Sequence, residues 1–406
     1  MAAAGETYWR LTRLPGVAAI LIAAALSRLG QRMLGFAIVL YALTRFDSPV
    51  LAGWLSFTAI APGLVISPLA GVLLDRAGTT RSIAIDLTAR TGLVLALMLV
   101  DLLEWASPPV LLWLTFGFAL TSPLSAAGVK VLLPRLVPAG VSDRAFAMDT
   151  AIYALVDVTA LPLAGVLMGF GGSALTFGAI AAAYAGASVC MALVPRQTAT
   201  ARTGRVLTDA VEGLVYVWRQ PSLRGLAIGY SLNMVTWGIL TVTVPVALAR
   251  LYGLGSFEGM AGLVWAGAGI GAGIGALADG KGRVFGREAR TMVTFMLATA
   301  FVVWPVAASF GVVGLASGLA MCGLLAGPID VCVLTLRQRR TDPARLGRVL
   351  AISMSLNMSG FPIGAALGGI LASWSVPAAF MAGALASVFG AVAIRRLVPD
   401  APEAAR

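Results

Sequence analysis

The chain has 406 residues, of which 59% are hydrophobic and only 12% are charged. A soluble domain usually carries about 25% charged residues, so this composition excludes an ordinary soluble protein and predicts that most of the chain lies in lipid. Histidine is absent, which excludes histidine-based catalysis and metal or haem sites that need histidine. The net charge of +11 comes from short basic clusters between apolar runs, a spacing that does not favour nucleic-acid binding.

The chain begins with a short polar segment, residues 1–13, followed by an apolar run too long for a signal-peptide core. A hydrocarbon core about 30 Å thick needs about 20 apolar residues per helix, and runs of that length recur along the whole sequence. They predict twelve spanning helices, at approximately 15–43, 50–73, 83–103, 109–133, 145–168, 173–194, 223–248, 257–279, 289–309, 312–336, 347–371 and 376–397.

The most polar internal stretch separates two halves of similar size. We therefore expect an N-terminal six-helix bundle over 1–194, a cytoplasmic linker over 195–222 and a C-terminal six-helix bundle over 223–406. The three cysteines lie in apolar runs without CxxC spacing, so they predict neither disulfides nor a metal site. The predicted fold class is an all-α membrane protein.

Basic residues predict the orientation of the chain, because cytoplasmic loops of membrane proteins are enriched in Lys and Arg. With both termini in the cytoplasm, only Arg45 and Arg250 of the 29 basic residues fall in segments on the opposite side. Arg28, Arg32 and Arg90 lie within predicted helices, and the others lie in or beside cytoplasmic segments. We expect both termini in the cytoplasm.

The two halves repeat in sequence. The segment GVLLDRAG at 71–78, after the second predicted helix, recurs as GALADGKG at 275–282, after the eighth. Six helices per repeat keep both copies in the same orientation, which predicts parallel repeats enclosing a site near the middle of the bilayer. The same offset of 204 residues relates Asp75 to Asp279, Arg135 to Arg339, Arg144 to Arg348, and Gly165 to Gly369.

The twelve predicted helices, the central linker and the loop pattern GxxxDRxGxxR at 71–81 resemble the major facilitator superfamily. That family has a motif of the form G-x-L-x-D-R-x-G-R-K between its second and third helices, although threonines at 79 and 80 replace the basic pair here. The segment EGLVYVWRQP at 212–221 resembles the siderophore- and macrolide-exporter branch. The resemblance implies alternating access, with a conformational gate formed by Gly71, Asp75, Arg76, Gly78, Arg81 and the repeat copy Asp279.

Charged residues inside predicted helices are candidates for function, because each costs at least about 2.5–3.5 kcal/mol at the membrane centre. Arg28 and Arg32 are one turn apart in the first helix, and Asp157 lies near the middle of the fifth. We predict that Asp157 exchanges protons. Either arginine is then its counter-charge or an anchor for an anionic substrate group. The alternative is a static ion pair that holds the two helices together.

Two further sites carry intramembrane charge. Asp86 and Arg90 have i,i+4 spacing in the third helix, which favours a self-contained pair over a functional one. Asp330 lies in the cytoplasmic half of the tenth helix, where proton coupling and a structural role are both open.

Proline and glycine suggest how some helices bend and pack. Pro162 and Gly165 predict a kink in the fifth helix, similar to a degenerate glycine-proline motif of antiporters, with an ordinary kinked helix as the alternative. Gly267, Gly271 and Gly275 are four residues apart in the eighth helix, which predicts close packing against a neighbouring helix. Residues that could line a substrate cavity, or serve only as packing and interfacial anchors, are Tyr41, Trp237, Asn233 and Asn357.

Together these features predict a secondary transporter that exports a hydrophobic or amphipathic small molecule, such as a drug, siderophore or secondary metabolite, in exchange for protons. The alternatives are an importer of an anionic solute and a lipid or lysolipid flippase on the same fold. Many proton-driven exporters of the family carry an acid in the first helix or an arginine in the middle of the fourth, and this chain has neither. We expect a monomer in the bacterial inner (plasma) membrane, without enzymatic activity, cofactor, metal or nucleic-acid partner.

Overall fold

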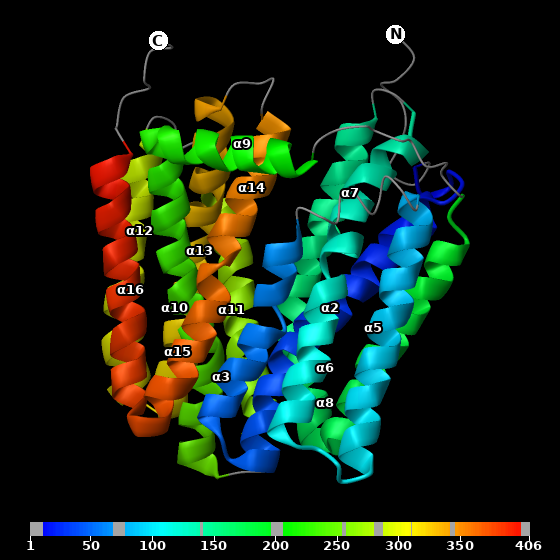
Figure 1. Ribbon diagram of the computed structural model, residues 1–406. Coiled ribbons are helices and arrows are strands. Elements are labelled where there is room, and N and C mark those ends of the chain that lie inside the picture. The colour runs from blue at the N-terminus through cyan, green and yellow to red at the C-terminus, as the bar shows by residue number, and fades with distance from the viewer. Residues whose placement is uncertain are drawn as a thin grey trace. The chain divides into compact units, whose positions relative to one another are not determined.

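The computed structural model describes residues 11–67, 78–138, 141–195, 206–253, 257–279, 287–309, 311–341 and 346–398. Within these ranges every regular element is a helix (Figure 1). Before the central linker the helices are α2 (Val17–Phe46), α3 (Pro49–Thr58), α5 (Thr79–Leu102), α6 (Pro108–Thr121), α7 (Pro123–Leu136) and α8 (Ser142–Ala192). From the linker onwards they are α9 (Val206–Arg219), α10 (Pro221–Tyr252), α11 (Glu258–Asp279), α12 (Glu288–Ser309), α13 (Gly311–Arg340), α14 (Leu346–Met358), α15 (Gly360–Trp374) and α16 (Val376–Leu397).

Ten helical segments in the described ranges are long and apolar enough to cross a membrane. One of them, α8, has 51 residues and would measure about 76 Å if straight, more than twice the thickness of a hydrocarbon core. Gly172 breaks it with φ 67° and ψ −163°, so α8 contains the fifth and sixth predicted helices. The 22-residue α12 coincides with the ninth. The predicted all-helical membrane fold is confirmed, while the count of twelve stays a prediction.

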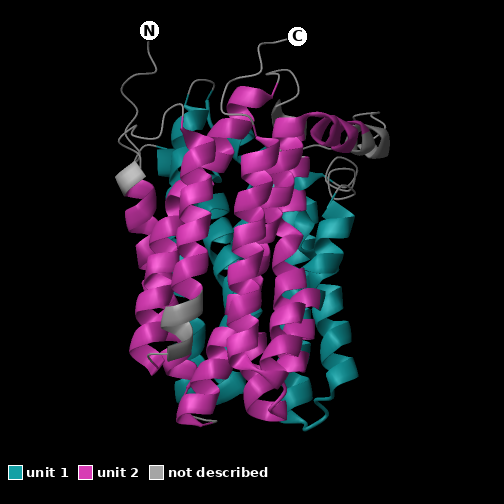
Figure 2. Cartoon of the chain, turned by 90° about the vertical axis from the view of Figure 1, so that its left-hand side faces the viewer, with its two compact units in different colours: residues 1–37, 58–206 teal, residues 38–57, 207–406 magenta. Residues whose placement is uncertain are grey.

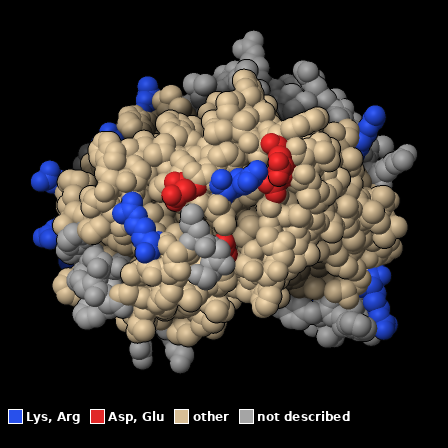
Figure 3. Space-filling model, turned by 90° about the horizontal axis from the view of Figure 1, so that it is seen from below, with Lys and Arg blue, Asp and Glu red and all other residues tan. Residues whose placement is uncertain are grey.

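The surface of the protein is apolar. Phe170 is 88% exposed and Leu277 and Trp374 are each 79% exposed, which in water would promote aggregation and in a bilayer provides contact with lipid. Figure 3 shows one face of the molecule, on which residues other than Lys, Arg, Asp and Glu make up most of the visible surface. This distribution is that of a protein whose solvent is lipid.

The chain divides into two compact units, coloured separately in Figure 2. Unit 1 consists of residues 1–37 and 58–206, and unit 2 of residues 38–57 and 207–406. One boundary falls inside α2, so the last third of this helix and most of α3 pack with the C-terminal helices. The bundle boundaries expected from the sequence stay a prediction.

In unit 1, α5 packs against α6, α7 and α8. The fourth predicted helix is interrupted, because α6 ends at Thr121 and α7 begins at Pro123. Proline lacks a backbone N–H, so it is tolerated at the start of a helix and ends the helix that precedes it.

In unit 2, glycines allow helix backbones to touch. A Cβ atom on Gly271 or Gly275 of α11 would collide with the carbonyl oxygens of Ala320 and Leu324 in α13, and Gly323 of α13 meets α11 in the same way. This contact confirms the close packing predicted for the eighth helix. A second set of close contacts joins α10 to α15 and α16.

The N-terminal part of the chain contributes one segment to this packing. A Cβ on Gly53 of α3 would lie 2.6 Å from the carbonyl oxygen of Ala365 in α15. Gly369 of α15 would in turn collide with the carbonyl oxygen of Pro49. The beginning of α3 therefore lies against the backbone of α15, with no side chain between them at these positions.

The linker helix α9 is tied to unit 2. It runs across the end of α10 (Figure 1), and its Val217 is buried against Leu223 and Val349. Just after α9, the Gln220 side chain donates to the backbone oxygen of Arg340 at 2.7 Å, and Arg340 donates to the Ser222 hydroxyl at 2.6 Å. The linker helix therefore belongs structurally to the C-terminal helices.

Candidate functional site

The predicted gating motif is only partly described. Gly78 directly precedes α5 with φ 83°, a conformation that favours glycine, and Arg81 in the first turn is exposed. Asp279 is the last residue of α11, and its side chain lies outside what the structure describes. The other members also lie outside the described residues, namely Gly71, Asp75 and Arg76. The gating role stays a prediction.

Arg28 of α2 forms an ion pair with a residue that the sequence reading missed. Its two terminal nitrogens donate to the two carboxylate oxygens of Asp149 in α8, Nη1 at 2.7 Å and Nη2 at 3.0 Å. Both side chains are largely buried. This bidentate geometry is the strongest arrangement of an arginine and a carboxylate, and it holds α2 against α8.

Arg32, one turn further along α2, pairs with Asp157. Its Nε lies 2.8 Å from Oδ1 of Asp157, and its Nη2 donates to the hydroxyl of Tyr153 at 3.1 Å. The Arg32 and Asp157 side chains are 45% and 37% exposed, so this pair is much less enclosed than Arg28–Asp149. Of the two arginines named as possible counter-charges of Asp157, Arg32 is the one that contacts it, and its role in proton exchange stays a prediction.

Tyr153 lies between the two pairs. The guanidinium carbons of Arg28 and Arg32 lie 5.2 and 5.8 Å from the centre of its ring, within the range of cation–π attraction. Asp149, Tyr153 and Asp157 follow one another at intervals of four, which matches the spacing of the two arginines. This helical periodicity was the signal in the sequence that identifies Asp149 and Tyr153.

The two pairs differ in what they can do. Asp149 accepts two hydrogen bonds in a largely buried position, so losing its charge would leave Arg28 without a partner. Asp157 has a single short contact with Arg32 and is 37% exposed. Breaking this contact therefore disturbs less of the surrounding packing than breaking the Arg28–Asp149 pair. We call the four residues Arg28, Arg32, Asp149 and Asp157 the ladder; its two arginines and two aspartates balance in charge.

The Asp86–Arg90 pair is fully buried in unit 1. Arg90 Nε lies 2.9 Å from Oδ1 of Asp86, and the second oxygen, Oδ2, accepts the backbone N–H of Ser125 at 3.0 Å. Ser125 lies in the first turn of α7, where a backbone N–H has no partner within the helix. Arg90 also stacks over Phe118 at 4.8 Å and contacts the Tyr184 hydroxyl at 3.4 Å. The pair connects α5 to α6, α7 and α8.

Asp330 of α13 lies in unit 2, where it is exposed and accepts a hydrogen bond of 2.5 Å from the hydroxyl of Tyr230 in α10. Trp237 is partly buried, and its ring centre lies 6.1 Å from that of Trp265 in α11. Asn233 is buried, with an oxygen that accepts no hydrogen bond from the described residues.

The remaining predicted residues are also placed. Asn357 is buried in α14 and, like Asn233, has an oxygen with no hydrogen-bond partner in the described ranges. Tyr41 is buried in α2, where its ring meets the edge of Phe46. Pro162 and Gly165 lie inside α8, before its non-helical break at Gly172. Their roles in a cavity or a kink stay predictions.

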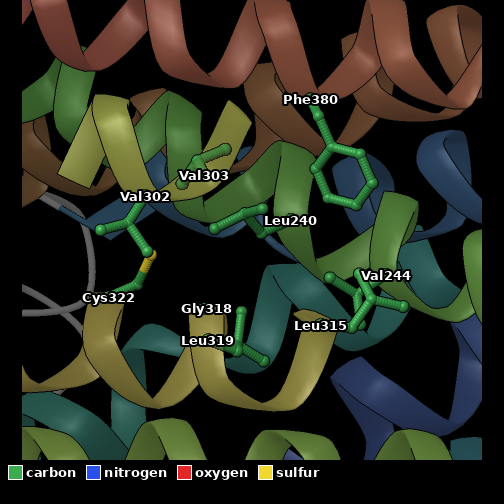
Figure 4. A pocket seen from close by; sticks show the side chains of 9 residues that line it. All are labelled: Leu240, Val244, Val302, Val303, Leu315, Gly318, Leu319, Cys322 and Phe380. Atoms are coloured by element: carbon green, nitrogen blue, oxygen red, sulfur yellow. The ribbon is translucent and has the colours of Figure 1, made fainter. Parts of the chain in front are cut away.

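An internal cavity in unit 2 is too small to hold a substrate. Figure 4 shows its lining, which comes from α10, α12, α13 and α16 and is entirely apolar, and the space available in it is about 10 Å³. That volume is at the lower limit for one water molecule, and a water also needs polar partners. We therefore assign this cavity to imperfect packing.

Comparison with known proteins identifies the fold. The sequence model of the Major Facilitator Superfamily matches residues 20–286 and, in a second match, residues 226–406. The chain belongs to the major facilitator superfamily. It is 48% identical over 397 residues to the uncharacterized MFS-type transporter y4rN of Sinorhizobium fredii (strain NBRC 101917 / NGR234), covering 97% of this chain and 98% of the relative. It is a multi-pass membrane transporter.

Solved structures agree on the fold. The nucleoside transporter NupG aligns with a TM-score of 0.73 at 13% identity, covering 93% of this chain and 98% of that one. A bacterial homologue of the iron transporter ferroportin, in an inward-facing state, aligns with a TM-score of 0.70 at 16% identity, covering 97% and 100%. At these identities the likeness establishes the architecture of the transporter and leaves its substrate to be argued from its own residues.

Proposed function

We propose that this transporter exports a hydrophobic or amphipathic small molecule in exchange for protons, by alternating access. The observation that supports this function best is the half-exposed Arg32–Asp157 pair on two membrane-spanning helices. Protonation of Asp157 would release Arg32, and deprotonation would restore the pair. A carboxylate that alternates in this way links proton binding to the contact between α2 and α8.

The ladder argues against the alternative in which Arg28 and Arg32 hold an anionic solute. Each arginine already has its own aspartate, at 2.7 and 2.8 Å respectively, so neither guanidinium is available without breaking an ion pair. Arg28 in particular is bidentate and largely buried. The distribution of basic residues in the sequence supports an orientation with both termini in the cytoplasm, and we place the transporter in the bacterial inner membrane.

Uptake of fluorescent amphiphiles into everted membrane vesicles tests this function, with and without a pH gradient, in the wild type and in Asp157→Asn. We expect wild-type uptake to collapse with the gradient and the variant to lose gradient-driven uptake. Asp157→Glu should restore part of it, because it restores a titrating carboxyl group. Gradient-driven uptake that survives in Asp157→Asn would make the Arg32 pair structural, and a folded protein that moves no amphiphile would contradict the export function.

A matched control is Asp149→Asn, which changes the other aspartate of the same helix face. Since Asp149 holds a largely buried arginine, we expect less folded protein in the membrane. The uptake per folded molecule should still depend on the gradient, because Asp157 is intact.

A further inference from the structure

Arg337, near the C-terminal end of α13, is a buried arginine that forms no ion pair with the residues that the structure describes. It is only 2% exposed. Its Nε and Nη2 atoms are buried and make no hydrogen bond to any described residue. The side chain comes from the same helix as Val333 and Leu336, which belong to an apolar cluster with Met292 of α12.

The other arginines that sit in ion pairs show what is missing at Arg337. Each has an aspartate or glutamate oxygen within 2.6–2.9 Å, including Arg90, which is equally buried. Arg90 and Arg32 also contact a tyrosine hydroxyl, so both form an arginine–tyrosine–aspartate group. The pairs are Arg28–Asp149, Arg32–Asp157, Arg90–Asp86 and Arg339–Glu288.

A third group of this kind exists in unit 2, but it is incomplete. Tyr230 is close enough to interact electrostatically with the Arg337 guanidinium. The Tyr230 hydroxyl also donates a hydrogen bond to Asp330. Arg337 lies two turns after Asp330 on α13, and a helical side chain leans towards the N-terminus, which brings the guanidinium back towards this level. The Asp330 carboxylate is exposed and bound to Tyr230, and it forms no ion pair with Arg337 among the described residues.

The two nitrogens without partners have a defined geometry. The N–H groups of Nε and Nη2 point in the same direction along one edge of the planar guanidinium. That edge matches the spacing of two oxygens of a carboxylate or phosphate, and such side-on contacts are bidentate. A neutral amide or hydroxyl group would accept at most one of these two hydrogen bonds. It would also leave the positive charge of the buried guanidinium uncompensated.

We propose that Arg337, together with Tyr230, binds a carboxylate or phosphate group of the transported molecule. The ligand class is thus an anionic amphiphile, whose charged group enters unit 2 beside Asp330 and whose apolar part meets the surrounding apolar side chains. This assignment rests on the proposed export function and names its substrate class. A buried guanidinium kept without an acid partner destabilises the resting protein, and a bound anion would offset that cost.

Equilibrium binding to the purified full-length protein tests the assignment, using ligands that differ only in their head group. Decanoate, decyl phosphate and decanol would be compared below the concentrations at which they form micelles. We expect the wild type to bind one or both anions at least about tenfold more tightly than decanol. A tenfold difference in affinity corresponds to about one charge-assisted hydrogen bond. Whichever of decanoate and decyl phosphate binds more tightly shows whether the site prefers a carboxylate or a phosphate group. Equal binding of all three would overturn the assignment.

Variants locate the effect. In Arg337→Gln the affinity for the anions should exceed that for decanol by no more than about twofold. This ratio is smaller than one charge-assisted hydrogen bond would provide. Arg339→Gln is the matched control, because Arg339 lies two residues away, is exposed and already pairs with Glu288. It should keep the wild-type preference. An anion preference that persists in Arg337→Gln, or disappears equally in Arg339→Gln, would contradict the assignment.

Stability gives a second readout that does not depend on any ligand. Because Arg337→Met removes a buried charge without a partner, we expect its melting temperature to rise by about 3 °C or more in the absence of anions. A fall in melting temperature would mean that Arg337 has a structural partner and is not kept for a ligand.

The binding assay has no membrane and no gradient, so it separates this inference from the proposed function. Asp157→Asn should retain the preference for decanoate or decyl phosphate over decanol while losing gradient-driven uptake. A stronger preference for anions in Asp157→Asn would place the anion at Arg32 instead, because Arg32 would then have lost its aspartate. If the protein binds the anions selectively but shows no uptake in vesicles, the proposed export function is contradicted and the assignment of Arg337 is not.

Discussion

Burial gives chemically identical residue pairs different roles in this transporter. The Asp86–Arg90 and Asp157–Arg32 pairs have almost the same length, 2.9 and 2.8 Å. The first is completely buried, and its aspartate accepts the backbone N–H of Ser125, whereas the second is 45% and 37% exposed. A charge that loses its partner in the packed interior has nothing else to bind, whereas the half-exposed Arg32 keeps room to reach another contact.

This difference predicts unequal effects of one substitution at two positions. Asp86→Asn should destabilise the protein by about 3–5 kcal/mol, because it leaves Arg90 buried without a counter-charge. Asp157→Asn should destabilise the protein less, because Arg32 is 45% exposed and is not enclosed by packed neighbours when it loses its partner. Thermal unfolding of both purified variants in the same detergent checks this. Equal losses of stability would show that Asp157 also has a structural role.

At the scale of helices, small residues decide which elements touch. In a bilayer the surrounding lipid is as apolar as the side chains, so helices associate through close packing and polar contacts. The glycines of α11 and α13 place one backbone directly on the other. Gly273 of α11 is different, because a Cβ there would meet no atom within 4 Å.

Two alanine substitutions on α11 test this packing. Gly271→Ala should destabilise the protein by about 1–3 kcal/mol, since the added methyl group collides with the Ala320 carbonyl oxygen. Gly273→Ala should be neutral or stabilising by up to about 1 kcal/mol, since alanine lowers the entropy of the unfolded chain. Melting temperatures of both variants provide the measurement, and a comparable loss in Gly273→Ala would rule out steric packing as the cause.

The contact between α3 and α15 predicts an effect on transport. If alternating access requires these helices to meet, Gly369→Leu should hold them apart, because the leucine would occupy the space of the Pro49 carbonyl. We expect uptake to fall at least about tenfold, which corresponds to about 1.4 kcal/mol on a conformational equilibrium. The control is Gly92→Leu, at an exposed glycine with open space around it. Normal uptake in Gly369→Leu would show that the contact is dispensable.

At the scale of the whole molecule, the orientation in the membrane is the main prediction. Arg45 and Arg219 are both exposed, but the charge distribution puts them on opposite sides of the membrane. In a background with alanine at the three native cysteines, Arg45→Cys should react with a membrane-impermeant maleimide in right-side-out vesicles. Arg219→Cys should react only in everted vesicles. The reverse pattern would invert the predicted topology and the direction of transport.

The sequence by itself determined the membrane class, the helical fold, the repeat and the superfamily. These properties depend on local quantities, namely the length of apolar runs, the position of charged clusters and short motifs. It also predicted the pairing of Asp86 with Arg90, because four residues on a helix bring two side chains together whatever surrounds them. Even the two helices within α8 followed from the lengths of the apolar runs.

Only the tertiary structure decided which distant charges meet. Arg28 and Arg32 were equivalent candidates for Asp157, and choosing between them depends on how α2 and α8 are shifted and rotated against each other. A shift of one turn, about 5.4 Å, exchanges the partners. The isolation of Arg337 was hidden for the same reason, because in the sequence it looks like one more cationic residue at a helix end. Helix packing has buried it near Tyr230 and left its Nε and Nη2 without a hydrogen-bond partner among the described residues.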